Sequence, residues 1–251
     1  MTDLVRIERH GDVALITLDR PEARNAMNVA LATQTVAAIQ DCQDAAAIVL
    51  TGADPAFCAG LDLRDLGVDQ LRDLPRFIDA AAASGVPIIA AVNGAAVTGG
   101  FELALACDFM IASERARFAD THLRVGVYPG PVAVDLPRRV GMAYAREMSL
   151  TGDFVDAAEA LRIGLVNHVV PHEQLLDAAM AKARSIAEQP RDMVAMLRQD
   201  WTATDRLPLD DARRVHYEHA ARGGFGAATG ATIAARREAV IARARGSAPT
   251  K

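Results

Sequence analysis

The stretch Val92–Ser113, VNGAAVTGGFELALACDFMIAS, decides the fold, because a strand, a glycine-rich turn and a helix follow one another there. The expected strand, Val86–Val92, runs into Gly99-Gly100, and the helix that follows is apolar except for Glu102. Glycines let a ligand approach the N–H groups at a helix start, where partial positive charge collects. Desolvation raises the pKa of a carboxyl in an apolar helix, which suits proton transfer. The stretch therefore offers an anion-stabilising site beside an acid or base.

Glu102 also has a second interpretation, which the sequence leaves open. If Gly99 is the N-cap, Glu102 occupies the third helical position, where a glutamate caps free N–H groups or favours the helix dipole. The glycines alone carry no nucleotide-binding signature. There is no G-x-G-x-x-G, and no Lys-Ser/Thr follows Gly99-Gly100.

Strands and helices alternate along residues 1–190, which predicts an α/β fold with a largely parallel sheet. The strands expected besides Val86–Val92 are a hairpin of Leu4–Arg9 and Val13–Leu18, then Ala47–Thr51, Phe109–Ala112 and Leu165–Val170. The helices expected besides the one with Glu102 are Asn28–Asp41, Leu74–Ala83 with Pro75 in its first turn, Ala143–Leu150, Asp156–Arg162 and His172–Glu188. Residues 191–251 read as wholly helical, with helices over Met193–Trp201, Asp210–Ala221 and Ala231–Ala242. We therefore divide the chain near Pro190.

Composition excludes several classes of function. The 251 residues are 51% hydrophobic and 24% charged, as in ordinary globular proteins, and the formal charge of -5 argues against nucleic-acid binding. No apolar run reaches membrane-spanning length, and the N-terminus lacks an apolar signal core. The three cysteines show no metal-ligand spacing. We expect a cytoplasmic protein with no metal site and no nucleic-acid or membrane partner.

A second turn rich in small residues follows the expected strand Ala47–Thr51, in the segment Ala56–Leu66, AFCAGLDLRDL. Loops at the carboxyl ends of strands gather at one edge of an α/β sheet, so this loop is expected to face the Gly99 turn. One backbone N–H from each loop could hold a developing oxyanion, and such donors are worth about 3–4 kcal/mol each. Cys58 with His122 as base offers a nucleophile interpretation, but nothing local favours a thiolate.

Five stretches in this order resemble the crotonase superfamily, that is, the enoyl-CoA hydratase/isomerase family. They are RPEARNAMN (Arg20–Asn28), AFCAGLDL (Ala56–Leu63), NGAAVTGGFELALACD (Asn93–Asp108), FADTHLRVGVYPG (Phe118–Gly130) and LTGDFVDAAEALRIGLVNHVV (Leu150–Val170). The resemblance implies a crotonase-like spiral of ββα units over residues 1–190. It also implies a C-terminal helical region, residues 191–251, that supports homotrimers or dimers of trimers.

The resemblance further implies an acyl-CoA thioester ligand, whose carbonyl lies in an oxyanion hole of two N–H groups. By position these are the N–H groups of Leu61 and Gly99. Arg24, Ala59 and Asp62 would line the path of the coenzyme A moiety. Because coenzyme A is part of the substrate, no separate cofactor is implied.

One residue departs from the family pattern. Hydratases of this family use two glutamates; Glu102 matches the first, but His122 stands where the second is expected. A histidine exchanges protons near neutral pH, so His122 either acts as a second catalytic residue or only lines the pocket. Asp120, two residues away, is a less favoured stand-in, and Tyr128 is a further, less favoured candidate for a polar group near the pocket.

The leading prediction is therefore a 2-enoyl-CoA hydratase with Glu102 and His122 as catalytic residues. Three alternatives remain open. The chain could be an enoyl-CoA isomerase, a specialised acyl-CoA dehydratase, or an acyl-CoA-binding protein without catalysis.

Overall fold

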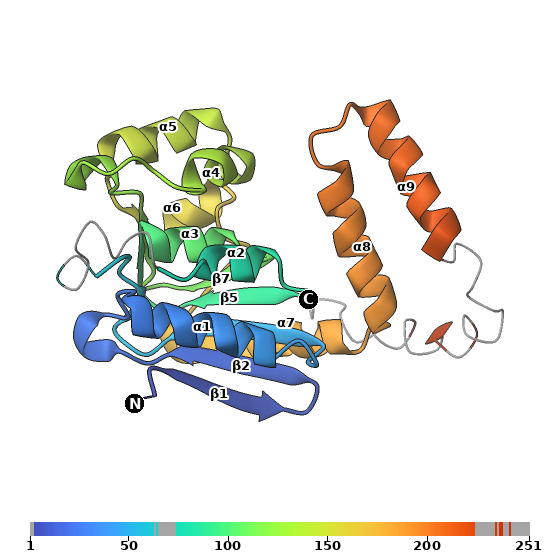
Figure 1. Cartoon of the computed structure of the whole chain (residues 1–251), viewed down its shortest axis with the longest axis horizontal. Helices are drawn as coiled ribbons and strands as arrows, with labels where there is room; N and C mark the ends of the chain where they lie inside the picture. Colours follow the sequence, from blue (N-terminus) through green and yellow to red (C-terminus); the bar gives the residue numbers. More distant parts are fainter. Residues whose placement is uncertain are drawn as a thin grey trace, which may run out of the picture. The chain divides into compact units, whose positions relative to one another are not determined.

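Two β-sheets and the helices packed on them form most of the structure (Figure 1). This computed structural model describes residues 3–62, 64, 74–223, 234, 236, 237 and 241. The chain divides into two compact units, Met1–Gln189 and Pro190–Lys251. Both sheets belong to the first unit.

The larger sheet has the strand order β1-β2-β3-β5-β7-β10. Its strands are β1 (Val5–His10), β2 (Val13–Leu18), β3 (Ala47–Gly52), β5 (Ile88–Val92), β7 (Phe109–Ser113) and β10 (His168–Val170). β1 and β2 form an antiparallel hairpin, and every other neighbouring pair in this sheet is parallel. The predicted hairpin and the largely parallel α/β sheet are confirmed.

The smaller sheet has the order β4-β6-β8-β9 and was not predicted from the sequence. Its strands are β4 (Ala56–Cys58), β6 (Ala95–Val97), β8 (Arg117–Ala119) and β9 (Val155–Asp156). The first three are parallel to one another, and β9 runs antiparallel to β8. Strands of two or three residues are too short to show the alternation that reveals a strand in a sequence.

The two sheets are built by a repeated unit of two strands and a helix. In each unit a strand of the larger sheet is followed by a strand of the smaller sheet and then by a helix. Three units follow this rule: β3-β4-α2, β5-β6-α3 and β7-β8-α4, with α2 at Phe77–Ala82, α3 at Gly99–Leu105 and α4 at Val132–Val140. The predicted spiral of ββα units is thus confirmed.

The larger sheet is covered on both faces, because successive side chains of a strand point in opposite directions. Ala14 and Ile48 face the cluster that includes α1 (Val29–Asp41) and α3, whereas Val13 and Val49 face the cluster that includes α7 (Leu175–Ala187). In Figure 1, α1 and α7 accordingly lie on opposite sides of the sheet. Coverage of both faces explains why β2, β3 and β5 are buried along their whole length.

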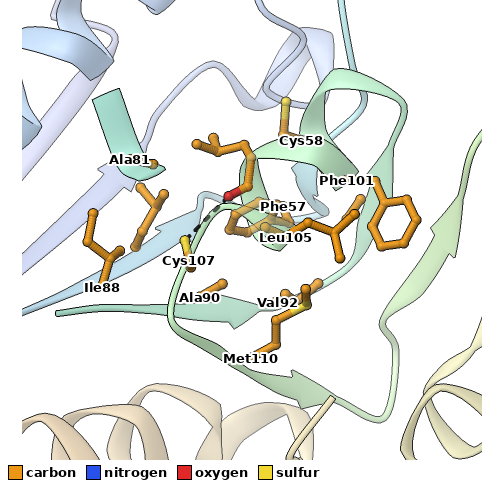
Figure 2. Packing of buried hydrophobic residues seen from close by; sticks show 14 of the residues in the cluster. Phe57, Cys58, Ala81, Ile88, Ala90, Val92, Phe101, Leu105, Cys107 and Met110 are labelled. Carbon is orange, nitrogen blue, oxygen red and sulfur yellow. Dashed lines mark hydrogen bonds between the residues drawn. The ribbon is translucent and has the colours of Figure 1, made fainter. Parts of the chain in front are cut away.

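Helix α3 is anchored in the main hydrophobic core (Figure 2). Phe101 and Leu105 project from the helix into the same cluster as Met110 of β7. The Phe101 ring lies 5.8 Å from the Phe118 ring, centroid to centroid. Full burial of a phenylalanine stabilises a fold by roughly 1.5–3 kcal/mol. Glu102, next to Phe101, is therefore carried on a firmly held helix.

Most helix boundaries differ from the predictions by a few residues, and two of the differences change an interpretation. Helix α2 begins at Phe77, so Pro75 lies before the helix and not in its first turn. The helix predicted over His172–Glu188 is split into a 3-10 turn, His172–Gln174, and α7. The remaining helices are α5 (Met142–Thr151), α6 (Ala157–Arg162), α8 (Arg191–Thr204) and α9 (Leu209–Gly223).

The second unit contains α8 and α9, which pack against each other. Asp200 of α8 accepts hydrogen bonds from Nδ1 of His216 at 2.6 Å and of His219 at 3.1 Å, both on α9. The helix predicted over Ala231–Ala242 falls largely outside the described residues. In the part of the chain that the structure describes, no helix is long and apolar enough to cross a membrane.

Candidate active site

Three loops meet at the carboxyl ends of β4, β6 and β8, because these short strands are parallel neighbours. Cys58 of β4 pairs with Ala96 of β6, and Val97 of β6 pairs with Ala119 of β8. The loop after each strand therefore begins at the same edge of the smaller sheet. The Thr98 N–H donates to the Ala119 carbonyl at 3.0 Å and ties two of these loops together. The loop that contains Gly60 and the turn at Gly99 therefore lie together, as predicted, at this edge of the smaller sheet.

Two glycines allow the loops to touch. A Cβ on Gly100 would lie 2.1 Å from the carbonyl oxygen of Cys58, and a Cβ on Gly60 would lie 2.1 Å from Oγ1 of Thr98. Gly60 also has a φ of +96°, which an L side chain rarely adopts. A Cβ on Gly99 would instead meet the Leu61 side chain at an ordinary 3.6 Å. Gly60 and Gly100 thus allow the loops to touch, while a Cβ on Gly99 would make only ordinary contacts.

Two backbone N–H groups in these loops have no acceptor among the described residues. Leu61 pairs with Met27, where Met27 N–H donates to the Gly60 carbonyl and Asp62 N–H donates to the Met27 carbonyl. The intervening Leu61 N–H therefore points away from Met27. Gly99 is the first residue of α3, so its N–H has no acceptor within the helix. Neither N–H donates a hydrogen bond to any described residue. That the two groups hold one anionic oxygen stays a prediction.

Glu102 does not cap its helix, so the capping interpretation is wrong. The N-cap is Thr98, which puts Glu102 at the fourth helical position, beyond the reach of a capping box. Its Oε1 accepts instead from the N–H of Val132, at 3.2 Å, at the start of α4. The residue is 5% exposed. Burial raises the pKa of the Glu102 carboxyl, which the Val132 N–H and the charge of His122 only partly oppose.

His122 lies beside Glu102, and Asp120 lies behind His122. Nε2 of His122 is 3.9 Å from Oε2 of Glu102. Nδ1 of His122 is 2.6 Å from Oδ1 of Asp120, which also accepts the backbone N–H of His122 at 3.3 Å. His122 is 7% exposed and Asp120 is 1% exposed. The three side chains form a buried row, Asp120–His122–Glu102, that joins the loop after β8 to α3.

The charges in this row support one another. Burial by itself lowers the pKa of His122, but the hydrogen bond to Asp120 and the charge of Glu102 outweigh it and raise that pKa above its usual value. Burial by itself raises the pKa of Asp120, but hydrogen bonds from His122 and Ser149 and the charge of His122 together outweigh it and lower that pKa. Asp120 is therefore an ionised carboxylate, which can only accept, so the proton on Nδ1 belongs to His122. The adjacent Nε2 faces Glu102.

Sequence reasoning undervalued Asp120, which the structure places in direct contact with His122. The D-x-H spacing in a loop was the available signal, because an aspartate often accepts hydrogen bonds from the backbone two residues on. Tyr128, expected near the pocket, is instead 87% exposed among the described residues. The structure thus replaces Tyr128 by Asp120 as the further polar residue next to the Glu102–His122 pair.

The three residues expected along the coenzyme A path lie near the Leu61 loop. The Ala59 N–H donates to the Arg24 carbonyl at 3.0 Å, and the side chain of Arg24 is exposed. Asp62 is buried and forms an ion pair with Arg20, whose Nη1 lies 2.5 Å from Oδ2 of Asp62. Sequence reasoning did not single out Arg20, although it opens the RPEARNAMN stretch. Contact of Arg24, Ala59 and Asp62 with a ligand stays a prediction.

Other arrangements do not make a second catalytic site. Cys58 is buried, and burial raises the pKa of its thiol to about 12, which disfavours the thiolate and contradicts the nucleophile interpretation. His172 bridges Oγ of Ser113 and Oδ2 of Asp54, each at 3.0 Å. Ser113 is fully buried and Asp54 is exposed, whereas a serine nucleophile must be accessible and its aspartate is buried. No group of three or more metal-ligating side chains occurs within the described ranges.

Comparison with known proteins decides the family. The model of the enoyl-CoA hydratase/isomerase family matches residues 8–221 of the chain. The chain belongs to this family. Among curated members, a protein of Rhizobium meliloti named probable enoyl-CoA hydratase is 44% identical over 217 residues, 83% of this chain and 84% of that protein. The family resemblance expected from the five sequence stretches is confirmed.

Solved structures of the enoyl-CoA hydratase/isomerase family agree with the fold. An enoyl-CoA hydratase from Mycobacterium avium is 46% identical, with a TM-score of 0.75, and the match covers 87% of this chain and 95% of that chain. An enoyl-CoA hydratase from Mycobacterium smegmatis is 30% identical, with a TM-score of 0.86, and the match covers 94% of this chain and 97% of that chain.

Proposed function

We propose that this protein is an enoyl-CoA hydratase, which adds water to a 2-enoyl-CoA thioester. The observation that carries the proposal is the buried Glu102–His122 pair beside the available N–H groups of Leu61 and Gly99. Membership of the enoyl-CoA hydratase/isomerase family supports it, as do relatives named as probable enoyl-CoA hydratases in Rhizobium meliloti and Dictyostelium discoideum.

The two N–H groups act on the thioester carbonyl. When water attacks the β-carbon, the electron pair of the double bond moves toward the carbonyl oxygen and forms an enolate. The N–H groups of Leu61 and Gly99 stabilise this oxygen, and each such donor lowers the barrier by about 3–4 kcal/mol. They lie on loops held in contact by Gly60 and Gly100, so the donors are fixed before the reaction starts.

Glu102 and His122 carry the protons. The closest atoms, Nε2 of His122 and Oε2 of Glu102, are 3.9 Å apart, and we propose that the pair starts the reaction as a carboxylate and an imidazolium, which stabilise each other at that distance. The carboxylate takes a proton from the attacking water as its oxygen bonds to the β-carbon. The imidazolium gives its Nε2 proton to the α-carbon as the enolate collapses. Transfer of the water proton from Glu102 to His122 then restores the pair, and the net change is addition of one water.

The coenzyme A moiety of the substrate contributes to binding. Coenzyme A is part of the thioester, and Arg24, Ala59 and Asp62 are proposed to lie along its path. Binding energy from this remote part of the substrate orients the acyl group at Glu102. Hydration moves protons and one water but no electrons between molecules, so we propose that the reaction uses no separate cofactor.

We also propose that the helical region of residues 191–251 mediates assembly into homotrimers or dimers of trimers. Large apolar side chains are exposed on its described helices, namely Met193, Leu197, Trp201, Leu209 and Tyr217. Such side chains on neighbouring turns suit contact with another subunit. Sedimentation equilibrium of the purified protein tests the assembly. The three free cysteines support a reducing, cytoplasmic compartment.

The test is a rate measurement with short and long 2-enoyl-CoA substrates, followed by the loss of absorbance of the conjugated enoyl thioester. Glu102→Gln removes the acid–base group but keeps its shape, and it should lower kcat by about 10²–10⁴-fold. Glu159→Gln, which changes a partly exposed glutamate of α6 that pairs with Arg162, is the control and should retain activity. Full activity in Glu102→Gln would refute the assigned role.

The same assay separates the alternatives. Conversion of a 3-enoyl-CoA without uptake of water would indicate an isomerase, and preferential loss of water from a hydroxyacyl-CoA would indicate a dehydratase. Tight binding of the thioester with no turnover across the panel would indicate a binding protein. Each of these results would contradict hydration as the main reaction.

A further inference from the structure

The row Asp120–His122–Glu102 gives Asp120 a position that the hydratase chemistry above does not use. Asp120 is 1% exposed and follows β8 directly, so the parallel pairing of Val97 with Ala119 fixes its place beside α3. Its Oδ1 accepts two hydrogen bonds from His122, one from the backbone and one from Nδ1. Two bonds from one residue set both the position and the ring orientation of that residue.

We propose that Asp120 is the positioning residue of the proton donor: it keeps Nδ1 of His122 protonated, turns Nε2 toward Glu102, and stabilises the imidazolium. The proposal rests on the proposed function for the reaction that His122 serves. It assigns to Asp120 a role that the family resemblance alone did not provide, because the sequence placed only Glu102 and His122 in the catalytic pair.

The contacts leave Nε2 as the only ring nitrogen that can deliver a proton. Nδ1 is occupied by Asp120 at 2.6 Å, a length typical of a strong, charge-assisted hydrogen bond. Nε2 and Oε2 of Glu102, at 3.9 Å, are too far apart for a direct hydrogen bond. Nε2 therefore makes no hydrogen bond to a described residue, whereas Nδ1 does.

The charged groups around His122 also favour its protonated form. Asp120 and Glu102 are the charged side chains that face His122 within the described chain, and both are carboxyl groups. When His122 gives up its Nε2 proton, the neutral imidazole that remains still carries a proton on Nδ1, where Asp120 accepts it. An amide in place of Asp120 can donate to Nδ1 instead, and that arrangement moves the ring proton to Nε2.

Nitrogen-15 NMR of the wild-type protein tests the position of the proton without any activity measurement. Above the pKa of His122, the neutral ring should carry its proton on Nδ1, with the resonance assigned by its loss in His122→Gln. A neutral ring protonated on Nε2 would overturn the proposal. In Asp120→Asn the imidazolium should lose its proton at a lower pH than in wild type.

Kinetics test the consequence. Asp120→Asn should lower kcat for hydration by about 10²–10⁴-fold with little change in KM, and the alkaline limb of its pH profile should move to lower pH. The matched control is Asp54→Asn, which neutralises another carboxylate hydrogen-bonded to a histidine, His172, and should keep the wild-type rate and profile. A wild-type kcat and pH profile in folded Asp120→Asn would overturn the proposal.

These measurements separate the two proposals. If the wild-type protein hydrates no 2-enoyl-CoA, the proposed function fails, and the NMR result alone decides whether Asp120 orients His122. If Asp120→Asn loses stability but its folded fraction keeps the wild-type pH profile, Asp120 is structural and the positioning role is refuted.

Discussion

Substitution of Gly100 by alanine tests whether the contact between two loops holds the oxyanion donors in place. The new Cβ would lie 2.1 Å from the Cys58 carbonyl oxygen and 2.8 Å from the Cys58 carbonyl carbon. Both are backbone atoms, so no side-chain rotation relieves the contact. Because real Cβ contacts essentially never fall below 3.0 Å, the Cys58 loop and α3 must separate by about 1 Å.

Two effects of this displacement can be measured. Overpacking of this size costs about 1–3 kcal/mol of unfolding free energy, offset by roughly 1 kcal/mol because alanine favours the helix more than glycine does. The separation also moves the Leu61 N–H relative to the Gly99 N–H, and a 1 Å misplacement of such groups lowers the rate by about 10²-fold. Urea unfolding gives the first quantity, and kcat/KM for a 2-enoyl-CoA gives the second.

The neighbouring glycine supplies the control for stability. A Cβ on Gly99 would meet Leu61 and Phe77 at 3.6–3.7 Å, which is ordinary packing. Gly99→Ala should therefore keep or slightly raise the unfolding free energy, whereas Gly100→Ala should lower it. Equal stability in the two variants, together with an unchanged rate in Gly100→Ala, would refute the idea that close loop packing positions the donors.

Two further predictions concern titration. The three cysteines, Cys42, Cys58 and Cys107, are buried, and burial raises the pKa of the Cys58 thiol to about 12. A thiol reagent should therefore label none of them until the protein unfolds. Rapid labelling of a folded sample would contradict this. The pKa of Asp120 is lowered because hydrogen bonds from His122 and Ser149 and the charge of His122 together outweigh burial. The stabilisation from ionised Asp120 is therefore complete above the unfolded pKa of about 3.9 and is lost as pH falls through the lowered value. Asp120→Asn should therefore flatten the acid side of the pH–stability curve, and an acid limb as steep as that of wild type would count against it.

Local patterns were sufficient for the elements of the larger sheet. β2 reads as a strand because its alternation with β1 across a turn predicts a hairpin, and β5 reads as one because it is an apolar run. Asn28 marks the start of α1 by accepting the N–H of Leu31. The family also followed from the sequence, because each of the five stretches that resemble it is an unbroken run of residues. Glu102 could be singled out because one acid in an apolar helix is conspicuous without any knowledge of its neighbours.

The sequence by itself thus determined the α/β class, the family and the acid at the start of α3. Only the tertiary structure decided how the site is assembled. The pairing of β6 with β8 brings Asp120 and His122 to Glu102, and α4 supplies the Val132 N–H that draws the carboxylate away from the end of its own helix. These contacts join residues about 20–30 positions apart, through strands of three residues. Periodicity reports only the neighbours of a residue along the chain, so contacts of this kind leave no periodic signal in the sequence.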